Sequence, residues 1–462
     1  MAGLAYIRET TRGGLNRLID SRLFRGVGAN VYGQAATLII QLGSVPLLLS
    51  AWGVQLFGLW IMISAIPSYL ALADFGFSTA AANDMTMATA RGAYAEARGA
   101  FQSVLQLNVL VSLGLVVITL VIVLLVPNRF LQTTSIISGT EVRLVLILQT
   151  IQMAATLCCG VFGGGFQSSG RYALGVVLSN SARLMESIAL VAGALLFHRF
   201  APAAALMLTA RLGALTAMAI VLMRVAPWLR IGFRDARLAD IRRLVGPAIA
   251  VTAVPSAFAV SLQGFVLVIG ATLSLDAVAV FSTVRTLTRA VIQAGSIVNG
   301  AIMPEVTRAF GARDSLRLRR LLRLNLISVI GLNAVAFAAV AMFGSWIVVW
   351  WTAGHIVPDP VLVIGLAVVA ALHSLWLSQA NLVLAVNRHA GYSYWFLVVC
   401  IAGVLAAIPV VRTLGLNWVL MPLLFGECVM ILIVARVFRL TFGGGGYVNA
   451  HVSEDNKVVG KK

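Results

Sequence analysis

The sequence predicts an all-α polytopic membrane protein with about twelve membrane-spanning helices. Hydrophobic residues make up 60% of the 462 residues and charged residues only 11%, whereas soluble proteins carry about 25% charged residues. The mean hydropathy is +0.96. The apolar residues form runs of about 20, the length that a spanning helix needs. These runs lack the period-2 alternation of strands, and a bilayer accepts only helices or closed barrels.

The apolar runs are joined by short connections. The longest connections are predicted at 83–100, 225–246 and 304–323. The predicted spans are 27–51, 55–82, 101–126, 144–166, 174–197, 204–224, 247–272, 277–303, 324–351, 361–386, 392–411 and 416–438.

The basic residues are distributed unequally between the two sides of the predicted bundle. Of the 34 Lys and Arg residues, 26 fall on the termini and even-numbered connections and 4 on the odd-numbered connections. Cytoplasmic segments carry such an excess of Lys and Arg. The asymmetry therefore predicts that both termini are cytoplasmic. It also attributes most of the net charge of +18 to topology, so nucleic acid is not an expected partner.

The positions of the connections predict a division into two six-helix lobes. The basic connection 225–246 falls at the midpoint, and Trp52–Arg98 can be laid on Leu273–Arg319 without a gap. This internal similarity predicts two lobes related by a pseudo-two-fold axis. The predicted parts are a basic amphipathic cytoplasmic N-terminus (1–25), an N-lobe (26–224), a basic cytoplasmic linker (225–246), a C-lobe (247–440) and a disordered cytoplasmic tail (441–462).

Ionisable side chains deep inside the predicted spans are the candidate functional residues. Each costs about 2.5–3.5 kcal/mol at the bilayer centre, so such residues usually face a bundle interior or a watery cavity. The four cations outnumber the three anions, and the enclosed cavity should therefore prefer anions. The seven residues are Asp74, Arg183, Glu186, Arg211, Arg285, Arg289 and Glu427.

Arg285 and Arg289 are the strongest candidates for binding a substrate. They are four residues apart and share one face of span 277–303, and no acid lies three or four residues from either. Two guanidinium groups on one face suit a diphosphate, which arginine can bind bidentately. The alternative is an ion pair with an acid on another helix. The acids that could serve are Asp74, Glu186 and Glu427.

Arg183 and Arg211 are the further candidates for substrate binding. Arg183 lies three residues before Glu186 in the same span, so an internal ion pair and cavity lining are both open. Arg211 lies about seven residues from the periplasmic end of its span, roughly 10 Å at helical rise. It could therefore extend to that face.

Glu427, His373 and Asp74 are candidate coupling residues or charge partners. Glu427 either pairs with an arginine or couples transport to protons. His373, the only histidine inside a span, is either a hydrogen-bonding residue or a proton relay. Asp74 precedes Phe75-Gly76, and the favoured interpretation is that it caps or kinks the helix there.

The sequence contains no motif for a cofactor, a metal or covalent catalysis. The four cysteines lie in apolar runs without metal spacing and are expected to be small buried hydrophobic residues. Gly163–Gly165 are not followed by the Lys and Ser/Thr of a phosphate loop. We therefore predict no ATP site, no metal, no cofactor and no enzymatic activity.

The sequence resembles polysaccharide biosynthesis flippases of the Wzx type from about Phe24 to Leu440. These proteins belong to the multidrug/oligosaccharidyl-lipid/polysaccharide exporter superfamily. The segments that carry the resemblance are Gly53–Trp60, Asp74–Gly76, Ala279–Phe281, Arg285–Arg289, Pro304-Glu305 and Gly311–Asp314.

The resemblance implies a V-shaped transporter in the bacterial inner membrane, with alternating access through a cationic central cavity. The implied substrate is an undecaprenyl-diphosphate-linked oligosaccharide, the repeat unit of an O-antigen, capsule or exopolysaccharide. It would move from the cytoplasmic to the periplasmic leaflet. Candidate partners are a coupling ion (H⁺ or Na⁺) and a glycan polymerase with its export machinery. No functional residue carries over from the family, because the cavity arginines vary in place among its members.

Two other functions remain open. A multidrug antiporter of the same superfamily would carry organic cations, which a net positive cavity should repel. A membrane glycan polymerase or ligase would act on the same lipid-linked sugar. Such an enzyme needs a sizeable periplasmic loop, and no connection predicted on that side exceeds about 17 residues, which argues against it.

Overall fold

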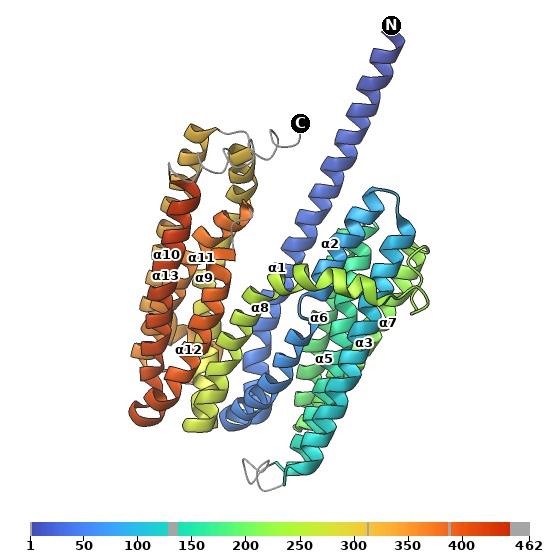
Figure 1. Ribbon diagram of the computed structural model, residues 1–462. Coiled ribbons are helices and arrows are strands. Elements are labelled where there is room, and N and C mark those ends of the chain that lie inside the picture. Colours follow the sequence, from blue (N-terminus) through green and yellow to red (C-terminus); the bar gives the residue numbers. More distant parts are fainter. Residues whose placement is uncertain (1, 128–136, 312–313, 387–389, 444–462) are drawn as a thin grey trace. The chain divides into compact units, whose positions relative to one another are not determined.

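A computed structural model shows an α-helical protein (Figure 1). The structure describes residues 2–127, 137–311, 314–386 and 390–443. Within these ranges the regular elements are α-helices and two short 3₁₀ helices, and no strand occurs. The predicted fold class, an all-α polytopic membrane protein, is confirmed.

The helices follow one another with short connections. Their bounds are α1 Ala2–Leu70, η1 Ala71–Asp74, α2 Phe77–Ala90, α3 Tyr94–Leu125, α5 Gly139–Ser168, α6 Tyr172–Phe197, α7 Phe200–Val225, α8 Leu238–Thr272, α9 Leu275–Gly311, α10 Ser315–Trp351, α11 Pro360–Ala385, α12 Ala390–Leu414, η2 Leu416–Val419 and α13 Leu420–Phe442. The predicted tail lies outside the described residues from 444 onward.

Every predicted span lies on these helices. Ten helical segments of the described chain are long and apolar enough to cross a membrane. The longest, Gly28–Ala90, contains two predicted spans and is divided at Gly53, whose φ of 71° breaks the helix. The helix α9, which carries Arg285 and Arg289, is not among the ten. Gly28–Ala90 holds two of the predicted spans, and each of the other nine segments holds one. With the span on α9, these make up the twelve predicted spans.

The helices extend beyond the apolar runs, and side-chain caps fix where α5 and α10 begin. Asp314 accepts a hydrogen bond from the backbone N–H of Arg317 at 2.9 Å and begins α10. Ser138 does the same for Glu141 at 3.2 Å and begins α5. Such side chains satisfy backbone donors that have no partner within the helix. Most residues of the predicted connections 83–100 and 304–323 therefore belong to the ends of helices in the structure.

The chain divides into two compact units. Unit 1 comprises Met1–Trp52 and Ile66–Thr252, and unit 2 comprises Gly53–Ala65 and Ala253–Lys462. The predicted N-lobe (26–224) and C-lobe (247–440) differ from these units mainly in the segment 53–65, which groups with unit 2. The break at Gly53 lies where the chain passes from one unit to the other.

A close approach of two backbones ties the segment 53–65 to the rest of unit 2. A Cβ atom on Gly58 would lie 1.8 Å from the carbonyl oxygen of Leu275, and one on Gly270 would lie 2.6 Å from Sδ of Met62. Glycine lets helices come this close, which is a common device in membrane bundles. This contact connects residues far apart in the sequence, and hydropathy carries no signal for it.

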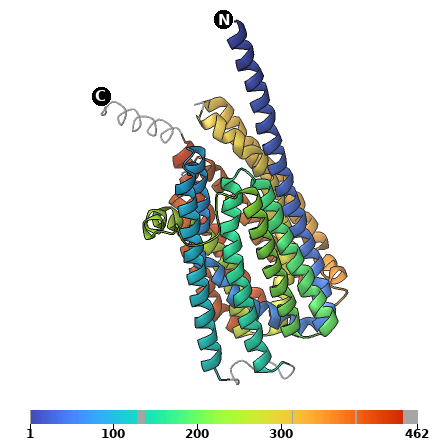
Figure 2. The same ribbon diagram turned by 90° about the vertical axis from the view of Figure 1, so that its right-hand side faces the viewer.

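Each unit has its own apolar core. In unit 1, the helices α2, α3, α5, α6 and α7 run side by side in both views (Figure 1, Figure 2). Phe101 of α3 and Phe162 of α5 stack there with ring centroids 6.2 Å apart. In unit 2, Trp376 of α11 meets Phe396 of α12 edge-on at 5.0 Å. The cores hold the helices that position the charged residues described next.

Large apolar side chains also cover the outside of the helices. Leu125 on α3, Met342 on α10 and Phe425 on α13 are each more than 70% exposed. Apolar exposure on this scale would be unfavourable in water. Together with the apolar spans, it identifies a protein whose helices are embedded in a lipid bilayer.

Candidate functional site

Helix α9 places Arg285 and Arg289 one turn apart on the same face. Nη1 of Arg285 donates a hydrogen bond to the backbone carbonyl of Leu262 on α8 at 2.8 Å. The guanidinium group of Arg285 also lies 5.0 Å from the ring centroid of Phe281, a cation–π distance. These contacts hold Arg285 without neutralising its charge.

Both arginines line a cavity inside unit 2, between α8, α9, α11 and α13. Its volume is about 110 Å³, enough to hold several water molecules. Its wall is largely apolar, with a few polar and charged groups. The lining residues are Phe258, Ser261, Leu262, Phe265, Phe281, Arg285, Thr288, Arg289, Ile292, Leu366, Val369, Ala370, His373, Leu423 and Glu427.

Glu427 faces the same cavity, but its carboxylate is already engaged. Nδ1 of His373 lies 3.0 Å from Oε1 of Glu427, and Nε1 of Trp376 donates to Oε2 at 2.5 Å. The His373 ring packs edge-on against Trp376 at 4.8 Å. The carboxylate therefore orients the imidazole, as second partners of histidine commonly do. The structure brings together Arg285, Arg289, His373 and Glu427, four of the predicted residues, around one cavity.

The two arginines of the cavity have no carboxylate partner among the described residues. Each acid considered as a partner is engaged within its own unit. Glu427 bonds to His373 and Trp376, Glu186 to Arg211, and Asp74 to Ser78 and Asn108. The cavity thus holds two guanidinium groups against one carboxylate. Such a site can bind an anion with several hydrogen-bond acceptors.

Arg211 and Glu186 form a buried ion pair in unit 1. Nε of Arg211 donates to Oε1 of Glu186, and Nη2 of Arg211 donates to Oε2 at 2.5 Å. Gln152 adds a bond to Oε1 at 2.9 Å. Glu186 and Arg211 are only 5% and 6% exposed. Glu186 therefore joins α6 to α7 rather than pairing with Arg183 on its own helix.

Arg183 and Asp74 occupy separate places in unit 1. Arg183 is exposed on α6 and forms no ion pair with a described residue. Asp74 lies at the break where Phe75 and Gly76 have φ of 45° and 74°. Its Oδ1 accepts from the Ser78 hydroxyl at 2.6 Å and from Nδ2 of Asn108 at 3.0 Å. Asp74 thus anchors the first turn of α2, where a cap or kink was expected.

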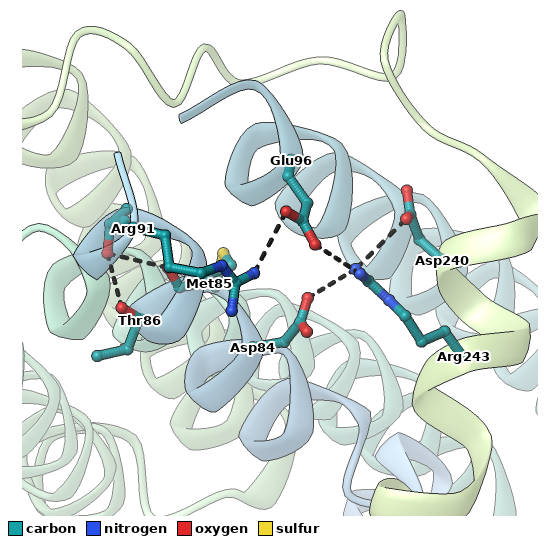
Figure 3. Close-up of polar contacts among 8 residues, drawn as sticks. Asp84, Met85, Thr86, Arg91, Glu96, Asp240 and Arg243 are labelled. Carbon is teal, nitrogen blue, oxygen red and sulfur yellow. Dashed lines mark hydrogen bonds and ion pairs between the residues drawn. The ribbon is translucent and has the colours of Figure 1, made fainter. Parts of the chain in front are cut away.

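The sequence reasoning missed a cluster of charges at the ends of α2, α3 and α8 (Figure 3). Arg243 of α8 donates to Asp84 and to Glu96 at 2.7 Å each, and lies 3.5 Å from Asp240. Arg91 bonds to Glu96 from the other side at 3.3 Å. The pKa of Arg243 is raised above its ordinary value, mainly by the hydrogen bond from Arg243 to Glu96. Only the i,i+3 spacing of Asp240 and Arg243 was visible in the sequence.

This cluster joins the start of α8 to α2 and α3 within unit 1, so the Arg243→Ala substitution should destabilise the protein. We expect a loss of about 1 kcal/mol, since partly exposed ion pairs contribute about 0.2–1 kcal/mol each. The loss should shrink in high salt, which screens exposed charges. Melting in detergent at two salt concentrations measures it. The control is Arg242→Ala, which removes a neighbouring exposed arginine that has no ion pair with a described residue. Equal effects of the two substitutions would contradict a role for the cluster.

The described residues contain no group of three or more His, Cys, Asp or Glu side chains that could hold a metal ion. All four cysteines are free thiols.

Two helical units, membrane-spanning helices and a charged cavity inside one unit define a multi-pass membrane protein with a transporter fold. The fold matches that of a multidrug resistance MATE family transporter of the MOP superfamily in its inward-facing conformation, with a TM-score of 0.63 and 16% identity, over 89% of this chain and 94% of that one. It also matches the lipid II flippase MurJ in an inward closed conformation, with a TM-score of 0.65 and 10% identity, over 91% and 92%.

A third solved structure, a MATE protein in the bent conformation, matches with a TM-score of 0.57 and 12% identity over 89% of this chain and 92% of that one. No protein-family model and no curated protein matches by sequence. At these identities the likeness concerns the fold. It includes both multidrug transporters and a lipid flippase.

Proposed function

We propose that the protein is a flippase for an undecaprenyl-diphosphate-linked oligosaccharide. It moves the repeat unit of an O-antigen, capsule or exopolysaccharide from the cytoplasmic to the periplasmic leaflet of a bacterial inner membrane. In this proposal both termini are cytoplasmic, as the distribution of Lys and Arg indicates. A glycan polymerase and its export machinery would receive the product.

The observation that carries the proposal is the excess of positive charge in the cavity of unit 2. Arg285 is held by a backbone carbonyl and an aromatic ring, and no described acid forms an ion pair with Arg285 or Arg289. Two charges without partners in a membrane-embedded cavity are costly unless a ligand supplies the opposite charge. A diphosphate supplies two negative charges and several acceptors. The cavity of about 110 Å³ has room for a phosphate-sized group.

The fold supports translocation by alternating access. Related folds are those of MATE transporters in inward-facing and outward-facing conformations and of a lipid II flippase. We propose that Arg285 and Arg289 bind the diphosphate in one conformation and release it in the other. The lipid tail would remain in the bilayer throughout.

The His373–Glu427 pair is the proposed coupling element. It lies in the same cavity as the arginines, and its Nδ1–Oε1 distance is 3.0 Å. Uptake of a proton or a sodium ion there would change the net charge beside the diphosphate. The sequence has no ATP-binding motif, so an ion gradient or the membrane potential is the proposed source of energy.

A multidrug antiporter is the second candidate function. Glu427 faces the cavity, and MATE transporters share the fold. A single carboxylate opposite two arginines nevertheless leaves a net positive cavity, which should repel organic cations. A glycan polymerase or ligase has no comparable support.

Reconstitution of the purified protein into liposomes tests the proposal. The probe is a fluorescent undecaprenyl-diphosphate-linked monosaccharide, whose trans-bilayer movement is followed by chemical quenching of the outer leaflet. We expect movement only in vesicles that contain the protein. Ethidium uptake in the same vesicles is the control. Transport of ethidium without movement of the lipid would overturn the flippase and favour the antiporter.

A further inference from the structure

A carboxylate, a hydroxyl and an amide meet inside unit 1, at a break in one of its helical segments. Asp74 ends η1, and Phe75 and Gly76 follow with φ of 45° and 74° before α2 begins. The side chain of Asn108, midway along α3, bonds to Asp74 and is only 1% exposed. In membrane transporters, interrupted helices of this kind commonly carry the sites of coupling ions.

Packing within unit 1 fixes the break and the orientation of Asp74. A Cβ atom on Gly76 would lie 2.6 Å from the backbone carbonyl oxygen of Ala248 on α8, so glycine is required at this approach. The backbone N–H of Ser78 lies 3.2 Å from each carboxylate oxygen of Asp74. Contacts from α2 and α3 thus hold the carboxylate in place. A carboxylate that is held in this way is preorganised for a ligand.

Three oxygen atoms converge on Nδ2 of Asn108. They are Oδ1 of Asp74 at 3.0 Å, Oγ of Ser78 at 3.1 Å and the carbonyl oxygen of Leu157 on α5 at 3.3 Å. An amide nitrogen has two hydrogens, so these three acceptors share two donors. Oδ1 of the same amide is buried and has no hydrogen-bond partner among the described residues. Oxygen atoms are therefore in excess at this point.

The negative charge of Asp74 also has no cationic partner among the described residues. Its carboxylate accepts hydrogen bonds from the backbone and hydroxyl of Ser78 and from the amide of Asn108, all neutral donors. Glu186, by contrast, has Arg211 as its partner in the same unit. A charge within a spanning segment is costly, and buried charges are generally paired or bound to a metal ion. A bound cation would supply the missing charge.

We propose that Asp74, Ser78, Asn108 and the carbonyl of Leu157 form a binding site for a sodium ion. Turning the amide of Asn108 over exchanges Nδ2 and Oδ1, so an oxygen without a partner joins the other three. One positive charge then balances one carboxylate, whereas a divalent ion would leave a net charge. A proton would use one or two of these oxygens, not four. Oδ1 of Asp74 and Oγ of Ser78 lie 2.6 Å apart, a compact set that suits sodium better than the larger potassium ion.

The inference deepens the proposed function by naming a coupling ion and its place. It rests on that function in one respect, that an ion gradient drives transport. It assigns sodium to unit 1 and leaves the His373–Glu427 pair of unit 2 to protons. The structural argument for the site uses contacts within unit 1 alone.

Binding of radioactive sodium to the full-length protein tests the site. The protein in nanodiscs, without any lipid-linked sugar, is incubated with the ion, and scintillation proximity measures displacement by NaCl or KCl. We expect saturable binding that NaCl displaces more effectively than KCl. Asp74→Asn removes the charge, but its amide oxygen can still cap α2. This variant should bind sodium at least about tenfold more weakly, because it loses the one charged ligand.

Three further variants locate the binding. Asn108→Ala removes the amide and should lower the affinity for sodium about tenfold, as the loss of a supporting ligand commonly does. Ser112→Ala, one turn further along α3, removes a hydroxyl that bonds to the carbonyl of Ala154 at 3.4 Å, and should bind sodium as the wild type does. Glu427→Gln removes the carboxylate of unit 2 and should also bind sodium normally.

Melting of the wild type provides a measurement that needs no variant. A ligand that binds only the folded protein raises its melting temperature. The melting temperature should therefore be higher in NaCl than in KCl or choline chloride at equal concentration. Variants are compared with the wild type only where their melting temperatures in choline chloride match.

The outcomes separate this site from the flippase function. The site is overturned by a wild type without saturable sodium binding, by equal displacement with NaCl and KCl, or by normal binding in Asp74→Asn. Loss of binding in Glu427→Gln also overturns it, because sodium would then bind in unit 2. Failure of the proposed function would leave these binding results unchanged. It would appear as absent lipid movement in the liposome assay, in sodium and in choline salts alike.

Discussion

The double substitution Arg285→Ala/Arg289→Ala is expected to abolish binding and translocation of the lipid diphosphate. A hydrogen bond to a charged group contributes about 1.5–3 kcal/mol, so each arginine accounts for about tenfold to a hundredfold in affinity. The double variant should therefore bind undecaprenyl diphosphate at least about a hundredfold more weakly. Titration in nanodiscs measures the affinity, and surface polysaccharide at matched protein level measures the function.

The same substitution should leave the fold intact. It removes two like charges that lie one turn apart and have no carboxylate partner among the described residues. The melting temperature should therefore stay the same or rise, whereas loss of a structural pair would lower it. Arg285→Lys/Arg289→Lys is the matched control, because lysine keeps the charge but not the bidentate geometry. It should restore binding only in part. Normal polymer in the alanine variant would contradict the assignment.

Glu186→Ala is expected to cause the largest loss of stability among single substitutions in unit 1. It leaves the guanidinium group of Arg211 buried without its carboxylate. Breaking a buried ion pair from one side costs about 3–5 kcal/mol. We expect a large fall in melting temperature and in the yield of monodisperse protein, measured by size-exclusion fluorescence.

Replacing both partners tests what the pair does. Glu186→Leu/Arg211→Leu removes both charges, and replacing a buried pair with apolar residues is often neutral in stability. We expect this variant to be within about 2 kcal/mol of the wild type and to retain transport. A folded variant without transport would instead support the sequence-based prediction that Arg211 binds substrate. Arg183→Ala is the control for stability, because Arg183 is exposed and forms no ion pair with a described residue.

The sequence was sufficient for predicting which parts of the candidate site are chemically unusual. Arg285 and Arg289 stand out because each is expensive in a bilayer and has no acid one turn away. The sequence could not decide between partners on different helices. Arg211 and Arg183 are similarly deep in their spans, yet one pairs with Glu186 and the other is exposed. That choice depends on the packing of α6 against α7.

By itself, the sequence determined the class of fold and the positions of the spans. Hydrophobicity and charge act locally, residue by residue, against the bilayer as solvent. Tertiary structure alone decided the rest. It placed His373 and Glu427 beside the two arginines, grouped Gly53–Ala65 with unit 2 and joined Arg243 to Asp84 and Glu96. These contacts join residues far apart in the chain, and the packing that creates them leaves no periodic signal in the sequence.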